Sequence, residues 1–316
     1  MKPLVIVWRV TGRCNLSCAF CAYDRTQNIS RRHTDEQLVR QFAELAASLS
    51  RPVLLSWLGG EPLLWPALTQ LTRDLRQRHG FAISTTTNGT TLHREDVRQH
   101  LIEHYAELTI SLDGPAPLHD ALRGQSGLFE QIEHAVRQLA GRGPRLRINS
   151  VLMRHTIAHF PALCREVARW GIDEITCNQL GGIERPEFYP ANRLLPEQVA
   201  TLTTQWPDLH AELAAQGVRL LGGEGYLRRL AASARDEKLP VEDCGPGRDF
   251  LFVTEDGIAS PCSFTTADYG IDLRTITSPA QLADLPHEFA KRRLASRSAA
   301  CQDCHSTQVC AKFIAK

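Results

Sequence analysis

The sequence predicts an α/β fold built on a parallel sheet, and three observations lead to that expectation. Short apolar runs alternate with longer segments in which apolar residues recur at helical spacing. This alternation occurs six times at fairly even intervals between residues 4 and 180. Glycine or polar residues follow each apolar run. Strands and helices in this succession are typical of βαβ units, whose strands run parallel.

The apolar runs define the expected strands Leu4–Val10, Val53–Leu58, Ala82–Thr87, Leu108–Leu112, Leu146–Leu152 and Glu174–Gln179. The helices expected after them are Asp35–Leu49, Ala67–Arg78, Arg94–His104, Leu128–Ala140 and Phe160–Trp170. Thr34, followed three residues later by Gln37, predicts a capping box at the start of the first helix.

The regular alternation ends after Gln179. An irregular loop that includes Gly181, Gly182, Pro186 and Pro190 is expected there, then a helix from Pro196 to about Gln216 that is interrupted or bent near Pro207. A further helix is expected over Tyr226–Arg235. An Asp256-Gly257 turn between the apolar runs Phe250–Thr254 and Ile258–Ser260 predicts a β-hairpin. We therefore expect a barrel-like unit over residues 1–185, a helical linker over 186–240 and a Cys-rich unit over 241–316.

The overall composition describes an ordinary globular protein without a strong charge bias. The chain has 316 residues, of which 43% are hydrophobic and 22% are charged. Lys plus Arg number 36 and Asp plus Glu 35, so nothing favours binding to nucleic acid. No apolar run reaches the length of a membrane helix or a signal peptide, so a cytoplasmic location is expected. Ten cysteines in a reducing compartment are expected to be ligands or buried thiols.

Three of these cysteines, Cys14, Cys18 and Cys21, lie within eight residues directly after the first expected strand. Three thiolates at this spacing can share one metal centre and leave one coordination position open, as reactive centres do. A zinc site fits less well, since no histidine follows at finger spacing and the next cysteine is Cys164. A disulfide also fits poorly, because three is an odd number.

The residues that follow the later strands are also of types found in binding sites. In a parallel βα barrel, functional groups gather where the strands end. The sequences at these ends are Gly59-Gly60-Glu61-Pro62, Thr86-Thr87-Asn88-Gly89 and Ser111-Leu112-Asp113-Gly114, with Asn149 on the fifth strand and Cys177 and Gln179 on the sixth. Each motif alone could simply form a turn. Their ordered occurrence behind a cysteine cluster favours one shared site.

Cys14-x3-Cys18-x2-Cys21, with Phe20 before the last cysteine, resembles the signature of the radical S-adenosylmethionine (radical SAM) superfamily. Gly59-Gly60-Glu61-Pro62 resembles that family's second motif, and the resemblance covers about residues 4–180. It implies a partial (β/α)6 barrel of the TIM type. It also implies a [4Fe–4S] cluster on the three cysteines, with SAM bound to the open iron through its amino and carboxylate groups.

The resemblance further implies roles for particular side chains around SAM. Gly59 and Gly60 would let backbone carbonyls approach the SAM ammonium, and Glu61 would add negative charge beside it. Phe20 would pack against the adenine or simply belong to the core. The remaining implied contacts to the ribose, adenosyl or carboxylate groups are Asn88, Ser111, Arg123 and Asn149. Arg123 would form a bidentate pair with the carboxylate, unless it is a surface arginine.

A second cysteine set, Cys244, Cys262, Cys301, Cys304 and Cys310, resembles the SPASM/twitch extension of radical SAM enzymes. A full SPASM pattern would continue with Cys-x3-Cys, but position 314 is Ile and the sequence ends at Lys316. The resemblance therefore implies one auxiliary [4Fe–4S] cluster on Cys244, Cys262, Cys301 and Cys304. Cys310 would be left over or replace one of the four. A zinc site that includes His305 is the alternative.

Other residues have both a chemical and a structural interpretation. Cys177 could return a hydrogen atom to a substrate radical, as in an epimerase, or be a buried core cysteine. Asp113 could contact substrate or act as a base, or it could form a turn. Arg31-Arg32-His33 is interpreted as a solvated face, or else as a lid over an anionic substrate. Cys164 is expected in the core.

We therefore expect a radical SAM oxidoreductase whose auxiliary cluster accepts an electron from the substrate, with a flavodoxin- or ferredoxin-type electron donor as partner. A small polar metabolite is favoured as substrate, because the first strand begins so near residue 1 that no N-terminal peptide-binding domain fits. A peptide or protein side chain, as for ribosomal-peptide or sulfatase maturases, is the alternative. A non-catalytic iron–sulfur carrier is disfavoured by the Gly-Gly-Glu-Pro motif, because a carrier has no use for a SAM site.

Overall fold

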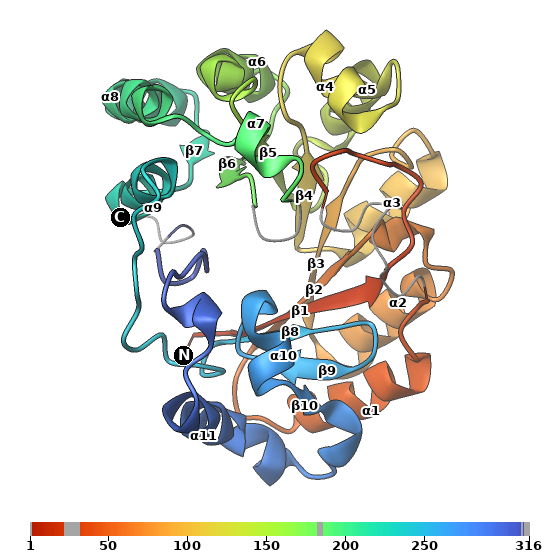
Figure 1. The fold of residues 1–316 in the computed structure, drawn as a ribbon. Helices are drawn as coiled ribbons and strands as arrows, with labels where there is room; N and C mark the ends of the chain where they lie inside the picture. Colours follow the sequence, from red (N-terminus) through yellow and green to blue (C-terminus); the bar gives the residue numbers. More distant parts are fainter. Residues whose placement is uncertain (1, 22–31, 182–185, 311, 313–316) are drawn as a thin grey trace.

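The computed structural model describes residues 2–21, 32–181, 186–310 and 312. Arg31, Gly182 and Ile314, to which the sequence analysis refers, lie outside these ranges. A ten-stranded sheet forms the centre of the molecule, with helices around its outer face (Figure 1). Within the described ranges, no helix combines the length and the apolar character needed to cross a membrane.

The first six strands follow the predicted order and differ from the predicted ranges only at their ends. They are β1 (Leu4–Thr11), β2 (Val53–Gly59), β3 (Ala82–Thr87), β4 (Glu107–Ser111), β5 (Arg145–Leu152) and β6 (Glu174–Gln179). Each pairs in parallel with the next. A two-residue strand that was not predicted, β7 (Arg219–Leu220), extends the sheet beyond β6. The sheet does not close on itself, so the predicted partial barrel is confirmed.

The helices that cover the sheet are α1 (Glu36–Ala47), α2 (Leu68–His79), α3 (Glu95–His104), α4 (Ala116–Arg123), α5 (Leu128–Leu139) and α6 (Phe160–Ala168). The sequence analysis missed α4, which begins after Pro115 and ends at Gly124 in a left-handed conformation. The predicted capping box is wrong by one residue, because Asp35 accepts the hydrogen bond from the Gln37 amide. The Thr34 hydroxyl is buried and instead accepts from Trp8 Nε1 at 3.2 Å and donates to the Glu255 carbonyl at 2.7 Å.

The later helices are α7 (Tyr189–Asn192), α8 (Pro196–Ala215), α9 (Glu224–Ala234), α10 (Thr266–Tyr269) and α11 (Pro279–Ala295). Helix α8 continues through Pro207, so the predicted interruption is wrong. The predicted hairpin is confirmed as the antiparallel pair β8 (Phe250–Val253) and β9 (Ile258–Ser260). Gly257 has φ +81° in its turn, and a Cβ there would lie 2.3 Å from Leu38 Cδ2, so only glycine fits.

The hairpin extends the central sheet, because β8 pairs in parallel with β1 on the side opposite β2. The short strand β10 (Ile271–Asp272) pairs with β9 and ends that edge. Helix α11 also contacts α1. Part of the predicted Cys-rich unit therefore shares the sheet and the helical layer with the N-terminal part of the chain.

Strand alternation determines which side chains face the interior of the partial barrel. Trp8 packs edge-on against Phe42 of α1, and Ile110 lies near Gly89 and Ile132 of α5, so these residues face the helices. Their neighbours along each strand face inward. Near the strand beginnings, this inner face has a network of ion pairs formed by Glu107, Arg145, Arg147, Glu174 and Arg219. Because these charged side chains occupy the inner face near the strand beginnings, the open end of the partial barrel lies at the carboxyl ends of the strands.

Candidate active site

The three N-terminal cysteines lie in the loop that begins where β1 ends. The loop turns back on itself through a hydrogen bond from the Cys21 amide to the Cys18 carbonyl at 3.0 Å. Cys18 is buried, whereas Cys14 and Cys21 are partly exposed. The Cys18 thiol interacts electrostatically with both Cys14 and Cys21. The fold therefore brings together the three thiols that the sequence predicts to act together.

The Gly-Gly-Glu-Pro segment runs alongside this loop and needs its glycines for that reason. The Gly60 amide donates to the Thr11 carbonyl and the Glu61 amide to the Arg13 carbonyl, each at 2.8 Å. A Cβ on Gly59 would lie 2.5 Å from the Thr11 oxygen, and one on Gly60 would lie 2.2 Å from the Arg13 oxygen. The absence of side chains thus lets the end of β2 support the cysteine loop.

Glu61 is fully buried at the point where β2 and β3 end. Its carboxylate accepts hydrogen bonds from the Asn88 amide at 2.7 Å, the Thr87 hydroxyl at 2.9 Å and the Leu63 amide at 3.1 Å. Burial nevertheless raises the pKa of Glu61 to about 7, and these bonds oppose the effect only in part. A cation placed beside this carboxylate would favour its ionised form.

Hydrogen-bond donors are directed at the sulfurs of Cys14 and Cys18. The Leu16 amide lies 3.4 Å and Asn88 Nδ2 3.6 Å from Cys14 Sγ, and Arg123 Nη1 lies 3.9 Å from Cys18 Sγ. Burial raises the pKa of Cys14, and it raises the pKa of Cys18 to about 11. Such thiols need a bound metal centre to lose their protons, and the donors suit the resulting thiolates. The residues present therefore fit the cluster that the resemblance implies.

Arg123 is buried in the same site and is not a surface arginine. Its Nε and Nη2 donate to Asp113 Oδ2 at 2.7 and 2.6 Å, and its Cζ lies 5.1 Å from the centre of the Phe20 ring. The Asp113 side chain is fully buried, and its other oxygen accepts from the Val151 amide at 2.9 Å. The suggested role of Asp113 as a base or substrate contact therefore finds no support, because the carboxylate is enclosed by protein donors.

Ser111, Asn149 and Thr176 lie next to one another on the inner face of β4, β5 and β6. They form a polar row below the ends of the strands. The sequence analysis named Ser111 and Asn149 but missed Thr176. Its hydroxyl is buried and has no hydrogen-bond partner within the part of the chain that the structure describes. Period-two alternation from a Cys177 that was expected to face the cavity would have turned Thr176 outward, so the sequence pattern held no signal for it.

Cys177 occupies the opposite face of β6 and is fully buried in the core. Its thiol interacts electrostatically with that of Cys164 on helix α6. Burial raises the pKa of Cys177 to about 12. The predicted cavity position of Cys177 is therefore wrong, because strand alternation turns this side chain away from Asn149. Cys164 lies in the core, as predicted.

Four cysteines of the second set line one cavity near the C-terminus. They are Cys244, Cys262, Cys301 and Cys304, and Cys310 is not among the lining residues. The Thr265 hydroxyl lies 3.3 Å from Cys262 Sγ, and the Tyr269 hydroxyl lies 3.9 Å from Cys301 Sγ. The four cysteines come from three separate segments, which the fold brings together as the sequence analysis expected.

His305 is not directed at these thiols. Its Nδ1 lies 2.6 Å from Gln179 Nε2, and its Nε2 lies 3.1 Å from an Asp303 carboxylate oxygen. Within the described residues, no three His, Cys, Asp or Glu side chains approach closely enough to hold one metal ion. Zinc ligands share one ion at about 2.0–2.3 Å, whereas each thiolate of a four-iron cluster binds a different iron. The contacts of His305 therefore do not support the zinc alternative that includes this residue.

The segment after Cys301 contacts helix α9 and strand β6. The buried Arg229 of α9 forms an ion pair with Asp303, and Lys312 donates to Asn178 of β6. Together with the His305–Gln179 contact, these bonds hold the second cysteine set against the ends of the barrel strands. Lys312 is buried and lies 5.3 Å from the centre of the Tyr226 ring, and sequence reasoning missed it.

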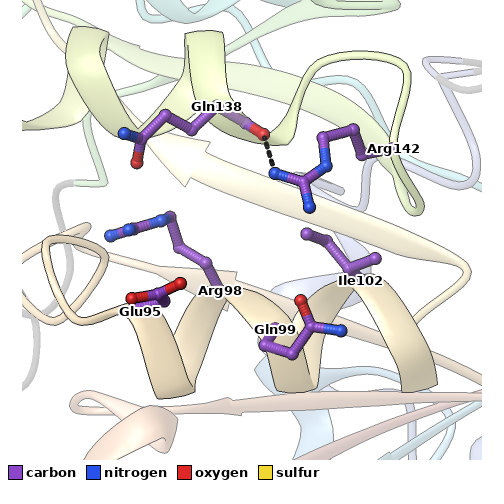
Figure 2. A pocket seen from close by; sticks show the side chains of 6 residues that line it. All are labelled: Glu95, Arg98, Gln99, Ile102, Gln138 and Arg142. Carbon is purple, nitrogen blue, oxygen red and sulfur yellow. Dashed lines mark hydrogen bonds between the residues drawn. The ribbon is translucent and has the colours of Figure 1, made fainter.

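Two other features lie outside this site. Arg32 is exposed and forms an ion pair with Asp256, which favours the solvated-face interpretation over a lid. A small cavity between α3 and α5 lies on the outer helical layer (Figure 2). Its volume of about 150 Å³ is below the roughly 300 Å³ of ordinary small-molecule sites. Its lining residues are Glu95, Arg98, Gln99, Ile102, Gln138 and Arg142.

The sequence is similar to proteins of known activity. It is 26% identical over 281 residues to the mycofactocin maturase MftC of Mycobacterium tuberculosis (strain CDC 1551 / Oshkosh), covering 84% of this chain and 66% of MftC. It is 25% identical over 271 residues to the AdoMet-dependent heme synthase of Methanosarcina barkeri (strain Fusaro / DSM 804), covering 83% of this chain and 77% of that protein. The chain thus spans slightly less than two thirds of MftC.

The fold resembles that of a protein of known structure. Streptococcus suis SuiB, in a crystal structure with the precursor peptide SuiA, superimposes with a TM-score of 0.72 at 15% identity, covering 98% of this chain and 71% of SuiB. The model of the radical SAM superfamily matches residues 8–167 of the 316. Members of this family use a [4Fe–4S] cluster and SAM. Sequence, fold and site geometry agree, and the chain belongs to the radical SAM superfamily.

Proposed function

We propose that this radical SAM enzyme removes a hydrogen atom and then an electron from its substrate, so that the net reaction is an oxidation. The observation that carries the proposal is the presence of two separate cysteine groups at the open barrel. Cys14, Cys18 and Cys21 follow β1, and four further cysteines line one cavity next to the strand ends. The first group would leave one iron of its cluster without a protein ligand, and the second group would provide four cysteine ligands.

With the first cluster and SAM bound, one electron delivered through the site would cleave SAM to methionine and a 5′-deoxyadenosyl radical able to abstract hydrogen. The chain's own residues would hold the reactants in place. Glu61 would face the SAM ammonium from its buried position, and Asn88 would support both Glu61 and Cys14. Ser111, Asn149 and Thr176 would offer hydrogen bonds on the inner face of the barrel. Fixing the reacting atoms in this way is the protein's main contribution.

The second cysteine group gives the substrate's electron a destination. The contacts of His305 with Gln179 and of Lys312 with Asn178 place this group beside the end of β6. Because Cys244, Cys262, Cys301 and Cys304 can saturate a four-iron cluster, we assign it an electron-accepting role and not a substrate-ligating one. Dehydrogenation and oxidative bond formation both fit this arrangement.

A peptide is the substrate class that we propose to test first. One relative is named a maturase, and SuiB, which has a similar fold, is seen with a precursor peptide. A small polar metabolite is the second candidate, since another relative is named a heme synthase. The epimerase alternative loses its hydrogen donor, because Cys177 faces the helices.

Anaerobic reconstitution tests the proposal. The protein, loaded with iron and sulfide and then reduced, is expected to convert SAM to 5′-deoxyadenosine and methionine. Changing Cys14, Cys18 and Cys21 to Ala should abolish this conversion, whereas C164A should retain it, because Cys164 is a buried cysteine outside both groups. Full iron loading of the wild type without any 5′-deoxyadenosine would contradict the proposal.

The second cluster has a separate readout. Iron content should be about eight atoms per chain in the wild type and about four when Cys301 and Cys304 are both changed to Ala. Deuterium transfer from labelled peptide or metabolite candidates into 5′-deoxyadenosine would then identify the substrate class. Unchanged iron in the double variant would refute the auxiliary-cluster assignment.

A further inference from the structure

We propose that the buried ion pair of Arg123 and Asp113 tunes the reduction potential of the cluster on Cys14, Cys18 and Cys21, with the Arg123 guanidinium next to Cys18 and Asp113 as its counter-charge. The inference rests on the proposed function, because it requires a cluster on those three cysteines. It gives Asp113 and Arg123 an action on the cluster itself, in addition to any contact with SAM.

Asp113 lies on one side of the guanidinium and pairs with it closely. Arg123 Nε and Nη2 both donate to Asp113 Oδ2, at 2.7 and 2.6 Å. Asp113 is in turn held by the Val151 amide of β5, which donates to Oδ1 at 2.9 Å. Its own amide donates to His119 Nδ1 at 3.2 Å. The carboxylate is thus held by β5 and the main chain of Asp113 by His119, so the counter-charge of Arg123 has a fixed position.

The cysteine loop contacts the guanidinium from the other side. Nη1 of Arg123 lies 3.9 Å from Cys18 Sγ, and Cζ lies 5.1 Å from the centre of the Phe20 ring. Cys18 and Phe20 are two residues apart in the same loop. The cation is therefore closer to the sulfur than the Asp113 carboxylate, which binds the guanidinium through Nε and Nη2.

Both charges of the pair are buried. The Arg123 side chain is 9% exposed and that of Asp113 is fully buried, so water screens neither charge effectively. Hydrogen bonds to cluster sulfurs and nearby charges are known determinants of iron–sulfur potentials. Reduction adds negative charge to the centre. Arg123 should therefore favour the reduced state, and Asp113 should partly oppose it.

The two members of the pair should consequently act with opposite signs. R123Q leaves a buried carboxylate near the cluster and removes the cation, so the reduced state is disfavoured. D113N keeps an oxygen that can accept from Val151 and removes the counter-charge, while Cys18 and Phe20 keep their contacts with the guanidinium, so the reduced state is favoured. If the pair had a purely structural role, both substitutions would shift the ratio of reduced to oxidised cluster in the same direction.

The test is a potentiometric titration of the loaded holoenzyme without SAM, followed by electron paramagnetic resonance. It is repeated with Cys301 and Cys304 changed to Ala, so that only the first cluster contributes. At fixed potential, R123Q should lower the ratio of reduced to oxidised cluster about tenfold, equivalent to about 59 mV for one electron. D113N should raise the ratio about threefold, and R123K should lie between R123Q and the wild type.

E174Q is the matched control, because Glu174 forms a buried ion pair with Arg147 at the beginning of its strand. Its ratio should equal that of the wild type. Shifts of the same sign in R123Q and D113N, or no shift in either, would overturn the inference. If R123Q does not retain iron, the inference is tested with D113N alone. A raised ratio of reduced to oxidised cluster in D113N supports the inference, and an unchanged ratio overturns it. Absence of a cluster from the wild type would instead refute the proposed function.

Discussion

At the scale of single residues, Glu61 shows how burial prepares a group for a ligand. The carboxylate has three protein donors, yet its pKa is raised to about 7 because burial outweighs them. The neutral form thus predominates in slightly acidic solution while no cation is present. A bound ammonium group would reverse this preference, which makes Glu61 suited to recognise a cation and not to contribute stability.

The pH dependence of unfolding tests this view of Glu61. Between its ordinary pKa of 4.5 and about 7, the folded state binds more protons at this site than the unfolded state does. Stability from this group therefore decreases as pH rises through that window. The free energy of unfolding of the iron-free wild type, minus that of E61Q, should fall by about 2–3 kcal/mol from pH 4.5 to pH 7.5.

Urea unfolding at several pH values measures this difference. E130Q changes an exposed glutamate on helix α5 and serves as the control for the loss of a glutamate side chain away from the site. A wild-type minus E61Q difference that is constant across the window would show that Glu61 is not the titrating group.

Gly60 gives a second prediction at this scale. In G60A, the new Cβ would lie 2.2 Å from the Arg13 carbonyl oxygen and 3.0 Å from Cys14 Cβ, so the cysteine loop must move. We expect the variant to lose most SAM cleavage and part of its iron, measured by 5′-deoxyadenosine formation and iron assay. G223A is the matched control, because no atom lies within 4 Å of its new Cβ. Equal activity of the two variants would contradict the close-approach argument.

At the scale of secondary-structure elements, the second cysteine group depends on contacts made by α9 and β6. Arg229 of α9 is fully buried and pairs with Asp303, which lies between Cys301 and Cys304. Asp303 Oδ1 also accepts the Leu239 amide at 3.1 Å. The cysteine pair is thereby fixed to a helix that is distant in sequence.

Replacing Arg229 should therefore affect one cluster and not the other. In R229Q, Asp303 loses its buried partner, and iron content should fall from about eight towards about four per chain. SAM cleavage without substrate should persist, because the first cysteine group is untouched. R228Q alters the neighbouring exposed arginine and should retain all of the iron. Full iron loading in R229Q would contradict the proposed anchoring.

At the scale of the whole molecule, the C-terminal quarter of the chain belongs structurally to the barrel. Strand β8 covers the edge of β1, and α11 contributes Leu282, Leu285 and Phe289 to the core. A chain that ends at Pro240 would expose an apolar strand edge, which promotes association. The boundary predicted near residue 240 thus separates two parts that share one sheet.

Truncation provides the corresponding measurement. Residues 1–240 alone should aggregate or elute as oligomers in gel filtration. The full chain with Cys244, Cys262, Cys301 and Cys304 changed to Ala should remain folded, since it keeps β8 and α11. A monomeric, cooperatively unfolding 1–240 fragment that holds the first cluster would show that residues 1–240 fold without the C-terminal part, contrary to this expectation.

The sequence by itself determined the six parallel strands and the cysteine motifs. The periodicity of apolar residues and the spacing of the cysteines can be observed directly in the sequence. Because each helix must bury its apolar face, the alternation of strands and helices leaves little choice of fold class. Its errors arose where a local sequence pattern was interpreted without the tertiary contacts of its residues. Thr34 appeared to be a helix cap because its pattern matched, but a tertiary contact with Trp8 and Glu255 occupies its hydroxyl. The helix α4 was missed, although it places Arg123 in the site.

Tertiary structure alone decided which candidate side chains face the site. Cys177 and Thr176 are adjacent in sequence, and only strand pairing shows that the cysteine faces the helices and the threonine faces inward. The partnership of Asp113 with Arg123 and the contact of His305 with Gln179 likewise join residues from different elements. The direction of a side chain and its contact partner depend on packing between distant segments. The sequence pattern can therefore identify candidate residues but cannot show where their side chains lie.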